Sequence, residues 1–127
     1  MRSRLSAIFW LERVENAVAE GRPDVDVMEF GVTIPVELKA IRDFPARPST
    51  PVLGDRRGLR RSQKNWLFNW TAKGGRGFIL VEIGDRLFAV PGDRAEKVNS
   101  FILSDFQPWE TDWEGRKNAS RFNSRRI

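Results

Sequence analysis

The sequence of 127 residues contains no cysteine, no histidine and no tyrosine, and these absences exclude several classes of chemistry. Disulfide frameworks, cysteine nucleophiles and zinc sites built from cysteine and histidine cannot form. A serine–histidine–aspartate triad is excluded because it needs an imidazole base, and attack by a tyrosine is excluded as well. Any catalysis must therefore use carboxylates, lysine and a hard metal ion.

Long hydrophobic runs are missing too, which bears on where the chain resides. No apolar segment approaches the roughly 20 residues needed to span a bilayer. Near the amino terminus an apolar stretch is interrupted by Glu12 and Glu15, and no small-residue cleavage site follows it. We therefore expect no membrane span, no signal peptide and a cytoplasmic protein.

The residues that are present describe a folded domain with an excess of positive charge. Hydrophobic residues make up 40% and charged residues 31% of the chain, which is ordinary for a globular protein. Lysine and arginine number 22 against 17 aspartates and glutamates, giving a formal charge of +5 and a pI of about 10.4. This balance favours a polyanionic partner.

The first half of the chain predicts a helix, two strands and a loop. Apolar residues at helical spacing predict an amphipathic helix over residues 4–16. Alternating and β-branched residues predict strands over residues 25–30 and 32–41, joined at Gly31. Prolines and glycines across residues 42–58 predict a long loop, and such loops in small domains are often functional.

The second half predicts a helix, a hairpin and a short helix. Helical spacing returns over residues 59–72. Two apolar runs, residues 77–83 and 86–90, flank a turn and predict a second hairpin. Asp93 is expected to be the N-cap of a short helix that ends near Leu103.

This order, α-β-β-α-β-β-α, predicts an α/β fold in which helices flank a central mixed sheet. We expect one domain over residues 1–104, followed over residues 105–127 by a partly ordered extension with a basic tail.

Three charged residues near the first hairpin could carry chemistry. Asp24 precedes the strand predicted over residues 25–30, and Glu37 and Lys39 share one face of the next strand because strand side chains alternate. Two carboxylates at the ends of paired strands would make a hard-oxygen site for magnesium, and an adjacent lysine could orient or deprotonate a water. The alternative is a solvated strand face on which Glu37 and Lys39 form a surface ion pair.

The arrangement resembles the signature of the PD-(D/E)XK nuclease superfamily. Pro23-Asp24 is followed by Glu37-x-Lys39, with thirteen residues from Asp24 to Glu37. The flanking segments that extend the match are Arg13-Val-Glu-Asn16, Gly21-Arg-Pro-Asp-Val25, Val36-Glu-Leu-Lys39, Ser62-Gln63 and Gly74-Gly75-Arg-Gly-Phe-Ile-Leu80. The segment from Arg13 to Pro91 looks like the small phage-encoded branch related to VRR-NUC and Holliday-junction-resolvase-like domains.

The resemblance implies a restriction-endonuclease-like core and a role for each matched residue. Asp24, Glu37 and the backbone carbonyl of Leu38 would bind Mg2+ or Mn2+, and Lys39 would be the catalytic lysine. Gln63, on the second helix, matches a glutamine that reaches back toward the site; its alternative role is that of an exposed helical glutamine. An intracellular enzyme, encoded by a phage or its host, is implied.

Further acidic residues compete for a place in this site. Glu15 matches the acidic residue that the first helix contributes in relatives, with Glu12, one turn earlier, as its competitor. Asp26 lies two residues beyond Asp24 on the same strand face and could replace or assist it.

Positive charge gathers just after this motif and predicts contacts with phosphates. The residues concerned are Arg42, Arg47, Arg56, Arg57, Arg60, Arg61 and Lys64. Phe44 could stack on a base, although pinning the loop to the body is the favoured role. Trp66 and Trp70 are expected to be core residues.

The function these features favour is a metal-dependent endonuclease acting on DNA, structure-selective for branched or nicked substrates. Cleavage of a four-way junction would require two active sites and hence a homodimer. A non-catalytic basic nucleic-acid-binding protein on the same fold is the alternative, and an interaction module whose charge serves solubility is a third reading.

Overall fold

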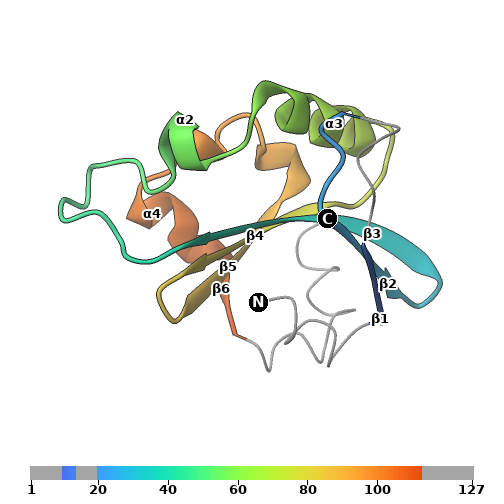
Figure 1. The fold of residues 1–127 in the computed structure, drawn as a ribbon, viewed down its shortest axis with the longest axis horizontal. Helices are drawn as coiled ribbons and strands as arrows, with labels where there is room; N and C mark the ends of the chain where they lie inside the picture. The colour runs from blue at the N-terminus through green and yellow to red at the C-terminus, as the bar shows by residue number, and fades with distance from the viewer. Residues whose placement is uncertain (1–9, 14–19, 113–127) are drawn as a thin grey trace.

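The computed structural model describes residues 10–13 and 20–112, which form one six-stranded sheet in the order β1-β2-β3-β4-β5-β6. Strands β3 and β4 pair in parallel, and every other neighbouring pair is antiparallel. The helices α2, α3 and α4 lie on one side of this sheet (Figure 1). The predicted α/β fold with a central mixed sheet is confirmed.

The first element differs from the prediction. Strand β1, Trp10–Arg13, pairs with β2 from Trp10 opposite Met28 to Arg13 opposite Val25. The predicted helix over residues 4–16 is therefore wrong for residues 10–13, because an open sheet edge offers hydrogen-bond partners that helical periodicity cannot reveal. The rest of that predicted helix lies outside the described residues.

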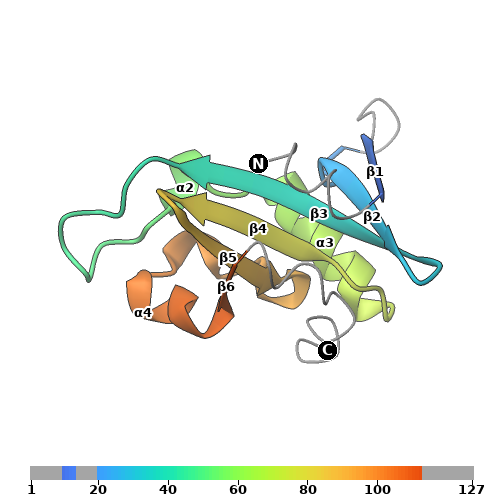
Figure 2. The same cartoon turned by 90° about the horizontal axis from the view of Figure 1, so that it is seen from below.

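The first hairpin follows the prediction closely. Strand β2 is Val25–Glu29 and strand β3 is Val32–Ile41. Phe30 and Gly31 make the turn with φ values of 51° and 76°, the left-handed conformation that two-residue hairpin turns require. Figure 2 shows β3 running the length of the sheet beside β4.

The connection between the two parallel strands carries the helices. Residues 42–53 form a loop, followed by the short helix α2, Gly54–Arg57, and by α3, Arg61–Ala72. The loop predicted over residues 42–58 thus contains one helical turn that the sequence did not indicate.

A buried asparagine fixes the end of this connection. Asn99 accepts the backbone N–H of Leu59 at 2.7 Å and donates to the carbonyl of Leu59 at 2.9 Å and to Asp55 at 3.2 Å. Gly58 lies so close to the Asn99 side chain that a Cβ atom there would clash with it. The segment between α2 and α3 is therefore held firmly against the body.

The second hairpin is also as predicted, but the helix expected after it is not. Strand β4 is Phe78–Ile83 and strand β5 is Arg86–Pro91. In place of one helix over residues 93–103, the chain forms two 3-10 turns, η1 (Gly92–Arg94) and η2 (Val98–Ser100). Asp93 lies inside the first turn and caps nothing. In the observed arrangement Val98, Phe101 and Phe106 all belong to one buried cluster.

The chain then returns to the sheet. Helix α4, Leu103–Phe106, is followed by the 3-10 turn η3, Gln107–Trp109, and by β6, Glu110–Thr111, which pairs with β5. The domain boundary expected at residue 104 falls inside α4, and Phe106 and β6 beyond it belong to the core and the sheet.

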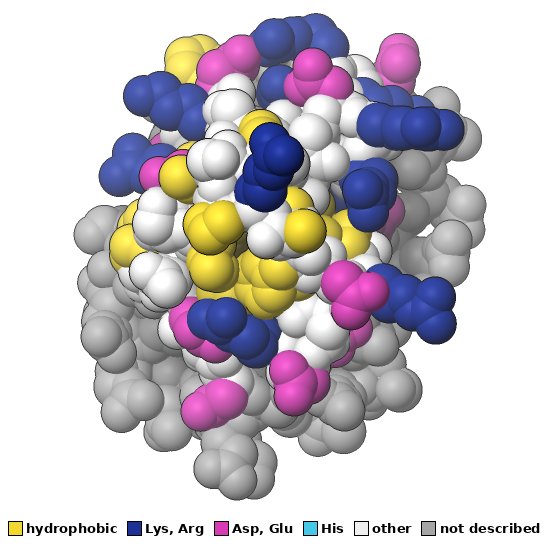
Figure 3. All heavy atoms as spheres, turned by 90° about the vertical axis from the view of Figure 1, so that its left-hand side faces the viewer, with side chains coloured by type: hydrophobic (Ala, Val, Ile, Leu, Met, Phe, Trp, Pro, Cys, Tyr) yellow, Lys and Arg dark blue, Asp and Glu magenta, His cyan; other side chains and the backbone are white. Residues whose placement is uncertain are grey.

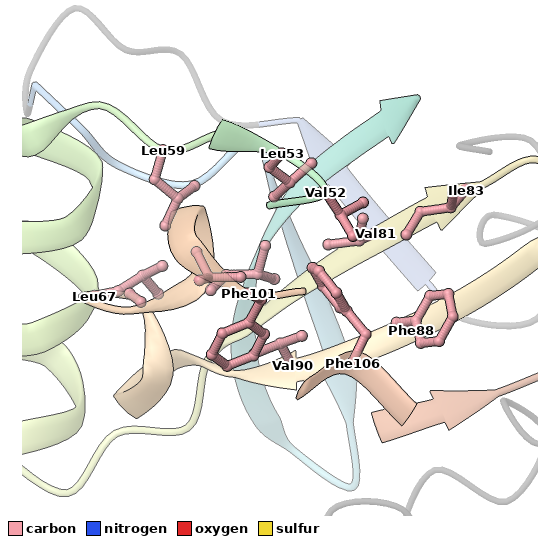
Figure 4. Close-up of a cluster of buried hydrophobic side chains, with 13 residues drawn as sticks. Val52, Leu53, Leu59, Leu67, Val81, Ile83, Phe88, Val90, Phe101 and Phe106 are labelled. Atoms are coloured by element: carbon pink, nitrogen blue, oxygen red, sulfur yellow. The ribbon is translucent and has the colours of Figure 1, made fainter. Parts of the chain in front are cut away.

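The two faces of the sheet carry separate apolar clusters, because successive side chains of a strand point to opposite faces. The cluster under the helices includes Leu67, Val81, Phe88 and Phe106 (Figure 4). The cluster on the opposite face includes residues of β2, β3, β4 and β5 and is packed against by Leu38. No helix in the described part of the chain has the length and apolarity needed to cross a bilayer.

Candidate active site

The sheet register brings the motif residues together. Val25 of β2 pairs with Val36 of β3, so Asp24 lies opposite Glu37 at the end of the ladder. The Asp24 carboxylate accepts the backbone N–H of Leu38 at 3.0 Å. This side-chain hydrogen bond extends the contact between the two chain segments beyond the last backbone pair of the ladder. Glu37 and Lys39 share a face of β3, and Glu37 meets α3 there through Gln63.

Glu37 is the most deeply placed of the charged residues. Only 2% of it is exposed. One carboxylate oxygen accepts the side-chain amide of Gln63 at 2.9 Å and lies 3.7 Å from the Lys39 ammonium nitrogen. The other oxygen, Oε1, is buried without a hydrogen-bond partner among the described residues. A surface ion pair, the alternative for Glu37 and Lys39, does not describe this arrangement.

The environment of Glu37 disfavours its charge. Burial, and then the nearby Asp24 carboxylate, raise the pKa of Glu37 from 4.5 to about 7, while Lys39 acts in the opposite direction. A buried carboxyl group beside a second carboxylate is the electrostatic situation that a bound cation relieves.

A close backbone contact docks the motif segment under α3. Gly21 adopts a φ of 84°, and a Cβ atom there would collide with the backbone oxygen of Ser62. Pro23 is fully buried beneath the same region. Residues 21–24 are thus fixed against the first turn of α3, beside Gln63.

The oxygen atoms of Asp24, Glu37 and Leu38 are the candidate ligands for a divalent cation. Asp24 and Glu37 lie on the same face, and Glu37 presents an oxygen without a partner. The N–H and C=O of one strand residue point to the same side, so the Leu38 carbonyl faces the same gap as its Asp24-bound N–H. Among the described residues, no group of three or more acidic, cysteine or histidine side chains could hold a metal ion. Two carboxylates suffice for magnesium, which keeps several waters when protein-bound, so the residues fit.

Asp26 has a different partner. One of its oxygens accepts Arg22 at 2.8 Å, and the other is buried without a hydrogen-bond partner in the described part of the chain. Glu12 lies in β1 opposite Asp26, and Glu15 lies outside the described residues.

The predicted phosphate-binding residues fall into two groups. Arg42 and Arg47 lie at the carboxyl end of β3 and in the loop after it, whereas the others lie on or next to α2 and the first turn of α3. Those of the second group are Arg56, Arg57, Arg60, Arg61 and Lys64. Arg61 forms an exposed ion pair with Glu96 at 2.8 Å, and the backbone N–H of Arg60 donates to Gln63 at 2.8 Å. Arg60 and Arg61 therefore lie at the start of the helix whose Gln63 contacts Glu37.

The loop end of the molecule has mixed character. Figure 3 shows basic side chains around a central apolar area, with acidic side chains among them. A shallow groove of about 270 Å³ lies at this end between Pro48, Ile102 and Leu103. Phe44 packs edge-on against Phe88, with ring centroids 6.1 Å apart, so it pins the loop to the body as favoured.

Trp66 and Trp70 are half-buried rather than core residues. Their rings stack with centroids 5.0 Å apart, and only Trp66 packs on the core cluster. A cavity of about 400 Å³ lies at the carboxyl end of α3, beside Phe68 and Gly77, and none of the predicted site residues lines it.

Sequence reasoning missed two residues that shape this region, Arg22 and Asn99. Arg22 gave no usable signal, because i, i+4 ion pairs are expected on helices and Arg22 and Asp26 lie outside any helix. Asn99 gave none, because its partners lie 40 residues away.

No protein-family model and no curated protein matches this chain. Among solved structures, it is similar to that of Archaeoglobus fulgidus Hjc, a Holliday junction resolvase from an archaeal hyperthermophile, with a TM-score of 0.60. The match covers 95% of this chain and 93% of that chain at 16% sequence identity. The chain shares the fold of this resolvase. The expected α/β fold, a central mixed sheet with flanking helices, agrees with this likeness.

Proposed function

We propose that this chain is a metal-dependent endonuclease that hydrolyses phosphodiester bonds in DNA. The observation that carries the proposal is the buried Glu37 carboxylate, which lies beside Asp24 and Lys39 and has one oxygen without a hydrogen-bond partner among the described residues. An uncompensated acid of this kind costs stability, and such residues concentrate at functional sites. The motif and the shared fold support membership of the PD-(D/E)XK superfamily; the phage-type branch rests on the motif flanks alone.

The metal would be Mg2+, with Mn2+ as a substitute, held by Asp24, Glu37 and the backbone carbonyl of Leu38. When bound, the ion would supply positive charge to the phosphate and lower the pKa of a water. No third carboxylate is needed, since substrate phosphates and waters complete magnesium coordination.

Lys39 and Gln63 would prepare the site for reaction. Lys39 keeps 20% of its side chain exposed while its ammonium nitrogen lies 3.7 Å from Glu37, so a substrate can reach it. There it would orient the attacking water and stabilise the extra charge that develops on the phosphate. Gln63 would hold Glu37 in its ionised, metal-binding form by donating to it.

The substrate would be branched or nicked DNA. Support comes from the shared fold with a Holliday junction resolvase and from the basic residues beside the site, of which Arg56, Arg57 and Arg60 form no ion pair with another described residue. Symmetric cleavage of a four-way junction would need a second copy of the chain. An intracellular enzyme, of a phage or its host, is part of this proposal.

A cleavage assay tests the proposal against the non-catalytic alternative. Supercoiled plasmid, linear duplex and four-way junctions are incubated with the protein in magnesium or EDTA, beside Glu37→Gln. We expect magnesium-dependent cleavage, strongest on the junction, that Glu37→Gln abolishes. Tight DNA binding without cleavage in either metal condition would instead establish the non-catalytic protein.

A further inference from the structure

Arg22 is a basic side chain beside the site that lies in the flanking segment Gly21-Arg-Pro-Asp-Val25 and has no role assigned so far. It precedes Pro23 and Asp24, and 28% of its side chain is exposed. One terminal nitrogen donates to Asp26 at 2.8 Å, and the guanidinium carbon lies 5.3 Å from the centroid of the Trp66 ring. The guanidinium is therefore held in place from two sides.

The contact between Arg22 and Asp26 is incomplete. Arginine and a carboxylate normally pair through two parallel hydrogen bonds. Arg86 and Glu110 of this protein do so, at 2.7 and 2.8 Å. Arg22 makes a single bond, and the second oxygen of Asp26 stays buried without a partner among the described residues. Two of the three guanidinium nitrogens are thus left without a described partner.

The position of Trp66 shows where the Arg22 guanidinium lies relative to the Glu37 site. Trp66 and Gln63 are three residues apart on α3, so they are neighbours on one face, about 4.5 Å apart along the helix axis. Gln63 contacts Glu37 and Trp66 contacts Arg22. The guanidinium therefore lies beside the Glu37 site, on the segment that leads through Asp24 into β2.

We propose that Arg22 binds the phosphodiester substrate, donating its free N–H groups to a non-bridging oxygen of the linkage that is cleaved. The inference rests on the proposed nuclease function and names a residue of that same site. Asp26 and Trp66 hold the guanidinium in one orientation before substrate arrives, so little of its freedom is lost on binding. The group also adds positive charge beside three carboxylates, Asp24, Asp26 and Glu37, where an anionic substrate would bind.

The first test compares three variants by kinetics. Arg22→Ala should lower kcat by about 100-fold, as removal of a donor to transition-state charge does elsewhere, and should raise KM by about tenfold because the same donor binds the ground-state phosphodiester. Arg22→Lys keeps the charge but loses the planar fork, and should recover at most a tenth of the lost activity. Arg86→Ala is the matched control, since Arg86 is likewise ion-paired and lies 5.1 Å over Phe44, away from the site; its kcat should equal that of the parent.

The second test measures DNA binding by a variant that does not cleave. In the Lys39→Ala background with magnesium, affinity is measured for an oligonucleotide whose mapped cleavage linkage is either a phosphodiester or a neutral methylphosphonate. Adding Arg22→Ala should weaken binding of the phosphodiester about tenfold and leave binding of the methylphosphonate unchanged. A purely structural role for Arg22 predicts equal losses for both.

The outcomes separate the two proposals. If the parent cuts no DNA, the proposed function and the role of Arg22 both fail. Should the parent cut and Arg22→Ala retain parental kcat, the role of Arg22 alone is overturned. The same follows if Arg22→Ala lowers the melting temperature more than Arg86→Ala does and Arg22→Lys restores stability and activity together.

Discussion

Gln63 donates its side-chain amide to Glu37 at 2.9 Å, while its own carbonyl oxygen accepts the backbone N–H of Arg60 at 2.8 Å. Because the oxygen is already bound to a donor, the amide nitrogen is the group that faces the carboxylate. Gln63 therefore favours the ionised form of Glu37 against the effect of burial, and it ties the first turn of α3 to strand β3.

Replacing Gln63 by leucine should weaken the metal site without unfolding it. Loss of a residue that supports a metal ligand typically costs 10- to 100-fold in affinity or activity. We expect the magnesium concentration for half-maximal cleavage to rise by at least about tenfold. Asn69→Ala, an exposed change on the same helix, is the control; an unchanged magnesium requirement in Gln63→Leu would remove the supporting role.

Stability of the metal-free protein should depend on pH through Glu37. Its pKa is about 7 in the folded chain and 4.5 ordinarily, so the folded state binds this proton more tightly and loses stability as pH rises from about 4.5 to about 7. Glu37→Gln removes that loss. In EDTA the variant should exceed the parent by up to about 3 kcal/mol at pH 8 and match it at pH 4, as measured by urea unfolding. An equal difference at both pH values would contradict the raised pKa.

Lys39→Ala should separate binding from cleavage. The change removes one of many positive charges, so DNA affinity should stay within about threefold, while cleavage should fall below detection because the water-orienting group is lost. Filter binding and plasmid cleavage measure the two properties. Lys73→Ala, at the exposed end of α3, is the control and should retain both; full activity of Lys39→Ala would make Lys39 a bystander.

Reversing three arginines at the site margin should weaken binding through phosphate contacts alone. Changing Arg56, Arg57 and Arg60 to glutamate should reduce affinity alike for unrelated sequences. The slope of log affinity against log salt should shrink by about 0.9 for each true phosphate contact on duplex DNA. Metal binding without DNA should be unaffected, as isothermal titration can show. If the triple variant keeps the salt dependence of the parent, the DNA binds on another face of the protein.

Gly21→Ala should separate α3 from the motif segment. The new Cβ atom would collide with the backbone oxygen of Ser62, at a residue whose φ of 84° already disfavours a side chain. We expect a loss of about 2 kcal/mol or more and reduced magnesium affinity. Gly74→Ala is the matched control, because its φ is 90° with no atom near the added Cβ, and it should cost about 1 kcal/mol. Equal losses would mean that the contact with Ser62 yields easily.

The sequence predicted the strands and the motif face well because those features depend on local alternation. That Glu37 and Lys39 share a face of β3 followed from the alternation of strand side chains. The two hairpins followed from the turn residues between the predicted strands. The contact from Gln63 to Glu37, across 26 residues, followed only from the family resemblance.

The predictions that were wrong share a physical cause: contacts with residues far away in the chain determined the local structure. Residues 10–13 joined the sheet edge instead of forming a helix. Residues 92–106 formed short turns instead of one helix, and their buried side chains Val98, Phe101 and Phe106 pack in a cluster with residues far away in the chain. Asn99 forms hydrogen bonds with the backbone of Leu59, 40 residues away, and no local sequence pattern predicts such a contact.

The parallel pairing of β3 with β4 has a consequence for the newly made chain. The two hairpins are local and can form within microseconds, but Val36 meets Phe78 only after the whole connection between them is folded back. A ribosome-bound chain that ends before Gln63 already carries Asp24, Glu37 and Lys39, yet it lacks the helix that orders them. Hydrolytic capacity should therefore appear only once synthesis has passed the second hairpin, so that unfinished chains do not cut nucleic acid.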